Sequence, residues 1–293
     1  MRLHWPILFT SLLLTVMLTT SPRALAAPER IVSADGALTE IVHALGAGEH
    51  LVGVDSTSLY PSEVQQLPRI GYKRALSVEG VLSLRPDLLL LTDDAGPDKA
   101  VLQLERSRLP LHRFSAEPTL DAVRDKVLGV ARLLNKPKQG VELWQQIARE
   151  VTEARAAATQ VQHPIRVLFV LGLNDRSPLV AGRNTHADSM IQLAGGHNVI
   201  DSFDGYKAIS PEAIAMTGAD LVLMMEQRNH ATTAEALFQQ PGFASLPAAR
   251  QQRLVKQDGL LMLGFGPRIG QAVRQLHDAF YPSGPMQETA HVH

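Results

Sequence analysis

The sequence of 293 residues contains no cysteine. Disulfide bonds and thiolate metal sites are therefore excluded, and the hydrophobic core has to stabilise the fold. Aromatic residues are scarce at 5%, and Trp144 is the only tryptophan beyond the N-terminal segment. The sequence also lacks an excess of either charge, because it has 28 Lys and Arg residues and 29 Asp and Glu residues. A net charge of −1 offers no basic surface for nucleic acid.

The common catalytic motifs are also absent. The chain has no G-x-S-x-G motif, no P-loop and no H-E-x-x-H motif. The Gly-rich run GFGPRIG at residues 264–270 does not fit the dinucleotide-binding pattern G-x-G-x-x-G. We therefore predict that the protein is not an enzyme. A zinc or manganese site needs three or four converging ligands, and the histidines are scattered, so only convergence in three dimensions would supply one.

The first 26 residues are typical of a cleaved signal peptide. Arg2 precedes an apolar stretch over residues 7–20, which is short for a membrane span, and Ala24-Leu25-Ala26 fits an A-x-A cleavage site. The lack of cysteine near this site excludes a lipid anchor of the bacterial type. We expect export to the periplasm of a Gram-negative cell.

One pattern occurs twice in the sequence. Residues 71–91 read GYKRALSVEGVLSLRPDLLLL, and residues 205–225 read GYKAISPEAIAMTGADLVLMM. Each copy has Gly-Tyr-Lys, a serine two residues before a glutamate, an apolar helical stretch, an aspartate and an apolar strand. A repeat at half-chain spacing predicts two similar lobes. A cleft between two lobes is a common place for a small ligand to bind.

Strands and helices alternate on both sides of a long helical stretch. We predict an N-terminal lobe over residues 28–137, a connecting helix over 138–162 and a second lobe over 163–282. The connecting helix would be roughly 35 Å long and would hold the lobes at a nearly fixed angle. The tail, residues 283–293, is expected to be disordered. The fold class is therefore α/β, with two similar lobes and the ligand cleft between them.

Residues 31 to 281 resemble the periplasmic binding proteins that serve ABC importers of ferric siderophores, vitamin B12 and haem. The segment GYKRALSVEGVLSLRPDLLLL is similar to the haem-binding subfamily, in which the tyrosine of Gly-Tyr-x-Arg-x-Leu-Ser ligates haem iron. The resemblance implies two α/β lobes joined by one long helix, little closure on binding, and delivery to an inner-membrane permease. It also implies haem b (hemin, Fe³⁺) as the transported ligand and a monomeric carrier.

Tyr72 is the tyrosine of this segment and our candidate for the axial ligand of the haem iron. Ferric iron prefers an anionic oxygen, and tyrosine is a known haem ligand. A free phenol has a pKa of about 10, and both iron coordination and a neighbouring cation favour its deprotonation. In an extended strand, Arg74 would share a face with Tyr72 and would reach its phenolate oxygen or a haem propionate. Lys73 is a weaker candidate for the same role. A tyrosine that only packs on the cleft wall is the alternative.

Further candidates lie in the second half of the chain. Tyr206 is the counterpart of Tyr72, but Ala208 replaces the arginine, so we expect Tyr206 to line the cleft rather than to bind iron. Arg228 follows the apolar strand predicted over residues 221–225, where ligands bind in open α/β sheets, and is expected to pair with the phenolate or a propionate. Further candidates for the cleft wall or a second ligand are Arg183, His186 and His230. The apolar wall that haem needs could come from the Gly-rich loop with Met262, Leu263 and Phe265, and a place in the core is the equal alternative for these three.

Glu79 and Glu212 occupy matched positions in the repeat. In the resembled class, one surface glutamate on each lobe pairs with arginines of the permease, which implies docking through these two residues. Both also begin short predicted helices, where an acidic side chain favours the helix dipole by roughly 0.3–1 kcal/mol, and this is the purely structural alternative. Exposed pairs of this kind would orient and accelerate docking more than they would tighten it.

The sequence thus predicts a periplasmic substrate-binding protein that captures haem and delivers it to an inner-membrane ABC transporter for iron and haem uptake. A ferric-siderophore or cobalamin carrier with the same fold is the main alternative. Trp144 lies in the predicted connecting helix, which argues against a cleft lined by tryptophan.

Overall fold

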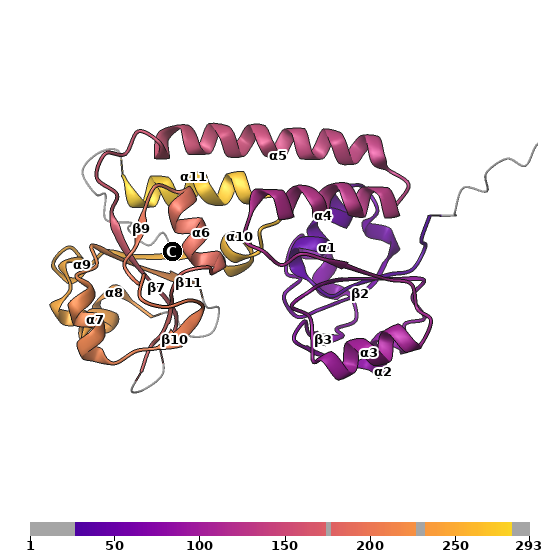
Figure 1. Ribbon diagram of the computed structural model, residues 1–293, viewed down its shortest axis with the longest axis horizontal. Coiled ribbons are helices and arrows are strands. Elements are labelled where there is room, and N and C mark those ends of the chain that lie inside the picture. Colours follow the sequence, from indigo (N-terminus) through magenta and orange to yellow (C-terminus); the bar gives the residue numbers. More distant parts are fainter. Residues whose placement is uncertain (1–26, 174–176, 227–231, 283–293) are drawn as a thin grey trace, which may run out of the picture.

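The computed structural model describes residues 27–173, 177–226 and 232–282, so the predicted signal peptide and tail lie outside the described residues. Two α/β lobes lie side by side beneath one long helix, α5 (Pro137–Ala158) (Figure 1). This arrangement confirms the two-lobed α/β fold. Within the described ranges, no helix is both long and apolar enough to cross a membrane.

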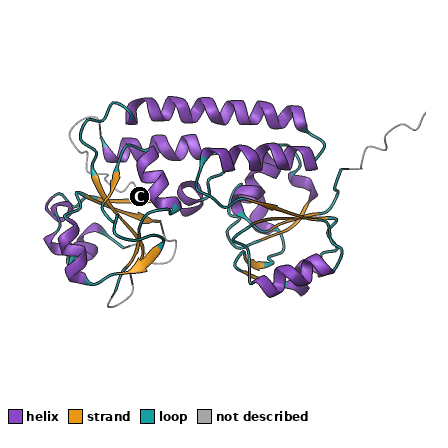
Figure 2. Ribbon diagram, viewed as in Figure 1, coloured by secondary structure: helices purple, strands orange, loops and turns teal. Residues whose placement is uncertain are grey.

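The N-terminal lobe is built on a four-stranded parallel sheet with the order β2-β1-β5-β6. Every residue of the two central strands is buried, as expected for parallel strands covered on both faces. Figures 1 and 2 show α1 and α4 on the side towards α5, and α2 and α3 on the opposite side. The elements of this lobe are β1 (Ile31–Ser33), α1 (Gly36–Ala44), β2 (Leu51–Val54), β3 (Gly71–Tyr72), β4 (Ala75–Leu76), α2 (Val78–Ser83), β5 (Leu88–Thr92), α3 (Asp98–Arg106), β6 (Leu111–Phe114) and α4 (Leu120–Leu133), with short 3-10 helices at Gly48–His50 and Ser62–Gln66.

The C-terminal lobe has a six-stranded mixed sheet with the order β10-β8-β7-β11-β12, and β9 also pairs with β7. Strand β8 is antiparallel to β7, and β10 is antiparallel to β8. Strand β11 is parallel to both of its neighbours, β7 and β12. The elements of this lobe are β7 (Arg166–Gly172), β8 (Leu179–Ala181), α6 (His186–Leu193), β9 (His197–Asn198), β10 (Tyr206–Ala208), α7 (Pro211–Thr217), β11 (Leu221–Met225), α8 (Ala234–Phe238), α9 (Pro247–Arg250), β12 (Leu254–Gln257), α10 (Gly259–Leu263) and α11 (Ile269–Phe280), with a 3-10 helix at Phe243–Ser245.

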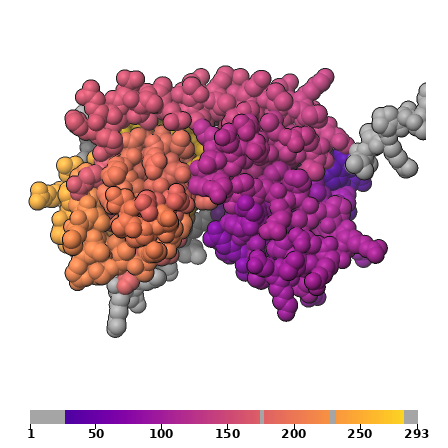
Figure 3. Space-filling model, in the orientation of Figure 1, coloured from indigo at the N-terminus to yellow at the C-terminus, as the bar shows by residue number. Residues whose placement is uncertain are grey.

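Helix α5 spans both lobes and packs along α4 and α11 (Figure 1). Its 22 residues correspond to roughly 33 Å. Two glycines allow the close approach: a Cβ at Gly270 of α11 would lie 2.7 Å from the Cβ of Glu150, and a Cβ at Gly140 of α5 would clash with Ala131 of α4. The lobes are therefore joined through helix packing as well as through the chain itself. Below α5, a notch separates them in the space-filling view (Figure 3).

The core under α1 allows a direct test of the packing. Leu38 is fully buried in the cluster that joins α1, α4 and α5, whereas Leu102 on α3 is 50% exposed. Leu38→Ala should lower the free energy of unfolding by about 2–5 kcal/mol, because it removes buried methyl groups and leaves a cavity. Leu102→Ala should change it by less than about 0.5 kcal/mol. Urea denaturation of the mature chain measures both, and equal losses would contradict the observed core.

Candidate functional site

Tyr72 lies on a small hairpin on the side of the N-terminal lobe that faces the other lobe (Figure 1). Strands β3 and β4 pair antiparallel with Tyr72 opposite Ala75, so Lys73 and Arg74 form the turn between them. The expected extended strand, with Arg74 on the same face as Tyr72, is therefore wrong, because the chain reverses direction after Tyr72. Tyr72 itself is 43% exposed.

The two cations of the turn are held by carboxylates at the ends of the central strands. Lys73 Nζ lies 3.0 Å from Asp35 Oδ2, just after β1, and 3.1 Å from Asp94 Oδ1, just after β5. Arg74 donates to Asp94 Oδ2 at 2.6 Å, and the Thr92 hydroxyl donates to Asp94 Oδ1 at 2.7 Å. The hairpin is therefore fixed to the carboxyl edge of the sheet by charge-assisted hydrogen bonds.

This network shifts the pKa values of its members. Burial alone would raise the pKa of Asp94, but the Thr92 hydroxyl and the neighbouring Lys73 and Arg74 outweigh it and hold this pKa at about 2. Burial alone would lower the pKa of Lys73, but Asp35 and Asp94 more than compensate, so it lies above the ordinary value. The Lys73 side chain is only 15% exposed. The sequence suggests it as a partner of a phenolate or propionate, whereas the structure already pairs it with two carboxylates.

Tyr206, the counterpart of Tyr72, belongs to the C-terminal lobe. It begins β10, pairs with Ala181 of β8, and packs edge-on against Phe169 at a ring-centroid distance of 6.4 Å. Burial raises the pKa of Tyr206, and this effect is opposed by hydrogen bonding with Ala187 and Thr185 and by the charge of Arg74. The pKa of Arg74 is raised mainly by its hydrogen bond to Asp94 and further by Tyr72 and Tyr206. Arg74 therefore lies within electrostatic reach of both tyrosines, which belong to different lobes.

The other candidates lie in different surroundings. Arg183 is exposed and pairs with Asp204 at 3.0 Å. Phe265 is fully buried, which corrects the expectation that it lines the cleft: its Gly-rich loop is inserted into the core rather than exposed. Met262 is fully buried as well. Arg228 and His230 lie outside the described residues.

His186 begins α6, where Thr185 caps the helix as the sequence indicates. Its ring packs edge-on against Phe265 at 5.3 Å. Burial, with a further contribution from Lys73 and Lys126, lowers the pKa of His186 to about 4. The imidazole is therefore neutral at neutral pH. No group of three or more His, Asp or Glu within the described ranges is arranged to hold a bare metal ion.

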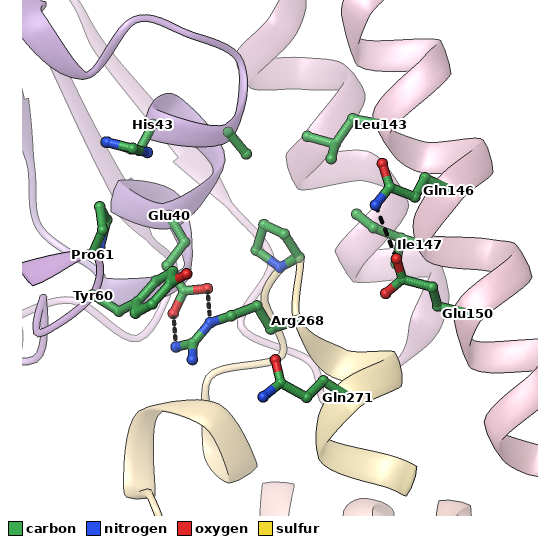
Figure 4. A pocket seen from close by; sticks show the side chains of 12 residues that line it. Glu40, His43, Tyr60, Pro61, Leu143, Gln146, Ile147, Glu150, Arg268 and Gln271 are labelled. Carbon is green, nitrogen blue, oxygen red and sulfur yellow. Dashed lines mark hydrogen bonds and ion pairs between the residues drawn. The ribbon is translucent and has the colours of Figure 1, made fainter.

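Two crevices flank Arg268 at the boundary between the lobes, and Figure 4 shows the larger one. The larger, of about 460 Å³, lies between α1, α5 and the start of α11; the smaller, of about 270 Å³, lies between the loops after β2 and β12. Arg268 donates to Glu40 at 2.6 and 2.8 Å, and its guanidinium lies 3.7 Å from the centre of the Tyr60 ring. Neither crevice is lined by Tyr72 or Tyr206, so both crevices are separate from these two tyrosines.

Glu79 and Glu212 are both exposed and lie in the first turns of α2 and α7. Ser77 and Ser210 cap these helices through their hydroxyl groups. A hydrogen bond with Ser210 lowers the pKa of Glu212. Figure 1 shows α2 and α7 on the same side of the molecule, away from α5. The helices that carry the two glutamates thus lie on one side of the molecule, one in each lobe.

Comparison with known proteins decides the family. A family model described as periplasmic binding protein matches residues 31–259. The chain belongs to the periplasmic binding protein family. The matched proteins bind ligands rather than catalyse reactions, and membership indicates a place outside the cytoplasm.

Solved structures of the family are similar along most of the chain. The periplasmic haem-binding protein RhuT from Roseiflexus sp. RS-1 is 40% identical, with a TM-score of 0.82 and coverage of 86% of this chain and 98% of RhuT. A periplasmic haem-binding protein from Pseudomonas aeruginosa is 38% identical, with a TM-score of 0.79 and coverage of 88% and 94%. The vitamin B12-binding protein of Yersinia pseudotuberculosis is 25% identical over 237 residues, which are 80% of this chain and 82% of that protein.

Sequence reasoning missed several polar residues of this periplasmic binding protein. Asp35 and Asp94 were not among the candidates, although each lies two residues after the end of a buried strand. Ligand sites in open α/β sheets lie at the carboxyl ends of strands, so this position was a usable signal. The pair of Glu40 and Arg268 joins residues 228 positions apart and gives no local signal.

The network around Asp94 predicts a pH dependence. Because the pKa of Asp94 is about 2 in the folded protein against an ordinary 3.8, its stabilising effect is present above about pH 4 and is lost as the pH falls through about 2. Asp94→Asn should therefore lower the stability at pH 7, and its difference from the unchanged protein should shrink towards pH 2.5.

Urea unfolding at pH 7, 4 and 2.5 measures this difference. Asp204→Asn is the control, because it breaks only the solvent-exposed pair with Arg183 and should change little. A deficit of Asp94→Asn that stays constant across this range would show that the ionised carboxylate is not the stabilising group.

Proposed function

We propose that this periplasmic binding protein captures haem b between its lobes and delivers it to the permease of an ABC importer in the inner membrane. The observation that carries the proposal is the hairpin itself, which presents Tyr72 at 43% exposure and, in its turn, the Arg74 side chain at 57% exposure. The similarity to periplasmic haem-binding proteins supports the same ligand. In the proposal, export places the mature chain in the periplasm.

Tyr72 would supply the axial oxygen to Fe³⁺, which arrives with the haem as cargo. A phenolate is a suitable donor for ferric iron, and a guanidinium beside it favours the deprotonated form. The Arg74 side chain is 57% exposed, so it could turn from Asp94 to a phenolate or propionate while Lys73 and Thr92 continue to hold Asp94. Tyr206 is half-buried and anchored in the main sheet, which suits a wall residue.

The haem propionates would bind to exposed arginines. Arg183 is 55% exposed, and its partner Asp204 is 60% exposed. An exposed ion pair contributes about 0–1 kcal/mol, so Arg183 can release Asp204 for a propionate without loss of fold stability. Arg228 remains a candidate for the same role from the loop after β11.

Replacement of the ligand tests the proposal. Titration of the mature protein with hemin should give saturable binding and a high-spin ferric spectrum with a tyrosinate charge-transfer band. Tyr72→Phe should abolish this band and weaken binding by at least tenfold, because it removes only the donor oxygen. Tyr206→Phe should keep the band.

Tyr60→Phe is the matched control, since Tyr60 is 46% exposed and Tyr72 is 43% exposed. Loss of the band in Tyr206→Phe rather than Tyr72→Phe would move the ligand to the C-terminal lobe. Absence of saturable haem binding would overturn the haem assignment, and titration with cyanocobalamin and a ferric siderophore would then test the alternative ligands.

In the proposal, docking to the permease uses Glu79 and Glu212. Their position on one face, one on each lobe, suits a basic partner that contacts both lobes at once. Long-range attraction of this kind raises the association rate and is screened by salt.

The double variant Glu79→Ala/Glu212→Ala should bind haem normally but should lower haem uptake by at least tenfold. Uptake is measured with ⁵⁵Fe-labelled haem in spheroplasts of the bacterium that encodes this chain, supplied with each purified protein. The control is Glu142→Ala/Glu153→Ala, which removes two exposed carboxylates from α5 on the opposite side of the molecule. Equal uptake by both double variants would exclude the proposed docking face.

A further inference from the structure

One loop of the C-terminal lobe, residues 264–268, reaches over to the N-terminal lobe. It connects α10 to α11, and both of these helices belong to the C-terminal lobe, after β12. Gly266 lies against α1 of the other lobe, because a Cβ at this position would be 3.2 Å from the Cβ of Ala37. We call these five residues the crossing loop.

The first anchor of the crossing loop is Arg268. Its guanidinium makes two hydrogen bonds to the Glu40 carboxylate of α1, at 2.6 and 2.8 Å, while Tyr60 covers its face at 3.7 Å. The Glu40 side chain is 5% exposed and that of Arg268 is 21% exposed. Loss of one member of such a buried, bidentate pair leaves the other charge without compensation.

The second anchor is Lys126 of α4. Its residue is 3% exposed, and Nζ donates to the Phe265 carbonyl at 3.0 Å. Among the ion pairs between described residues, none joins Lys126 to a carboxylate within 4 Å. Burial lowers the pKa of Lys126. Burying an ammonium group without a carboxylate partner costs free energy. The contact between Lys126 and the crossing loop therefore needs a functional explanation.

The contacts of each anchor continue towards a tyrosine of the site. Phe265 has φ of 48°, in the left-handed region, and its ring supports His186 at the start of α6. The next residue of α6, Ala187, contributes hydrogen bonding at Tyr206. On the other side, Asp35 caps α1, the helix that carries Glu40, and binds Lys73 beside Tyr72.

We propose that the crossing loop is an inter-lobe clamp, in which Lys126 and Glu40 act as positioning residues that set the separation of Tyr72 and Tyr206 for haem. The inference rests on the proposed function for its ligand, but the clamp itself can be tested without haem. The two crevices beside Arg268 leave room for the lobes to shift when the clamp is broken.

The absence of native cysteine makes the lobe separation directly measurable. Lys99→Cys on α3 and Glu235→Cys on α8 place spin labels at exposed positions of different lobes. The distance distribution from double electron–electron resonance is recorded for the ligand-free protein and for the variants Lys126→Met and Glu40→Gln. Lys126→Met keeps the side-chain length, and Glu40→Gln keeps the shape of the carboxylate.

Lys136→Met is the matched control. Lys136 also donates from Nζ to a backbone carbonyl, that of Gly46 at 3.1 Å, but this contact does not cross between the lobes. We expect a broadened or shifted distribution in Lys126→Met and Glu40→Gln, and an unchanged one in Lys136→Met. Circular dichroism verifies folding, and Glu40→Gln decides the test if Lys126→Met does not fold.

Haem dissociation provides the second readout. Transfer of haem to excess apomyoglobin should be roughly tenfold faster from both clamp variants, with the tyrosinate band shifted, because the donor is displaced from its optimal position. Distance distributions and dissociation rates like those of the control would overturn the clamp. If the unchanged protein bound no haem, the proposed function would fall, while the distance distributions would still decide the clamp.

Discussion

The packing of α5 against α4 and α11 is the constraint on which the rest of the structure depends. One helix contacts both lobes along its length, and Ile147, Val151 and Ala154 are buried in this contact. Because a helix is stiff over this length, a change in lobe angle has to break side-chain packing rather than rotate a loop. In the proposed function, a site between the lobes is therefore largely formed before the ligand arrives, which reduces the entropy that binding has to overcome.

The repeated Gly-Tyr-Lys motif is built into two different frameworks. In the N-terminal lobe it forms a two-stranded hairpin outside the main sheet, whereas in the C-terminal lobe it forms the edge strand β10 of that sheet. The framework explains the difference in environment, since Tyr72 is exposed and Tyr206 packs on Phe169. Only the first copy carries an arginine, and it also has Asp94 to orient that arginine. The two copies thus place one tyrosine at the surface and the other against the main sheet, which is what the proposed roles of donor and wall require.

Much of the fold could be predicted from the sequence. Strands such as Leu51–Val54 and Leu111–Phe114 and the long connecting helix are marked by apolar runs and helix periodicity, which are local signals. The connecting helix ends at Ala158, earlier than the predicted boundary at 162.

The failures concern tertiary context. The chain reverses at Lys73 and Arg74, within a segment whose sequence is typical of a short strand. A two-residue turn made of polar residues is hard to distinguish in sequence from an extended strand. Phe265 lies in a Gly-rich run that resembles a surface loop, but contact with both lobes buries it. The role of Lys126 could not be predicted, because its partner carbonyl is 139 positions away.

The separation of the β3-β4 hairpin from the main sheet has a mechanical consequence. The hairpin is held to the sheet by the ion pairs of Lys73 and Arg74 and by backbone hydrogen bonds, in which Ser56 donates to the Gly71 carbonyl at 2.8 Å and Gly96 donates to the Lys73 carbonyl at 2.9 Å. These contacts are local, so the hairpin could be displaced without breaking the hydrogen-bond ladder of the main sheet. In the proposed function, unloading would therefore involve a few contacts at one edge of the lobe, while the sheet and the packing of α5 stay intact.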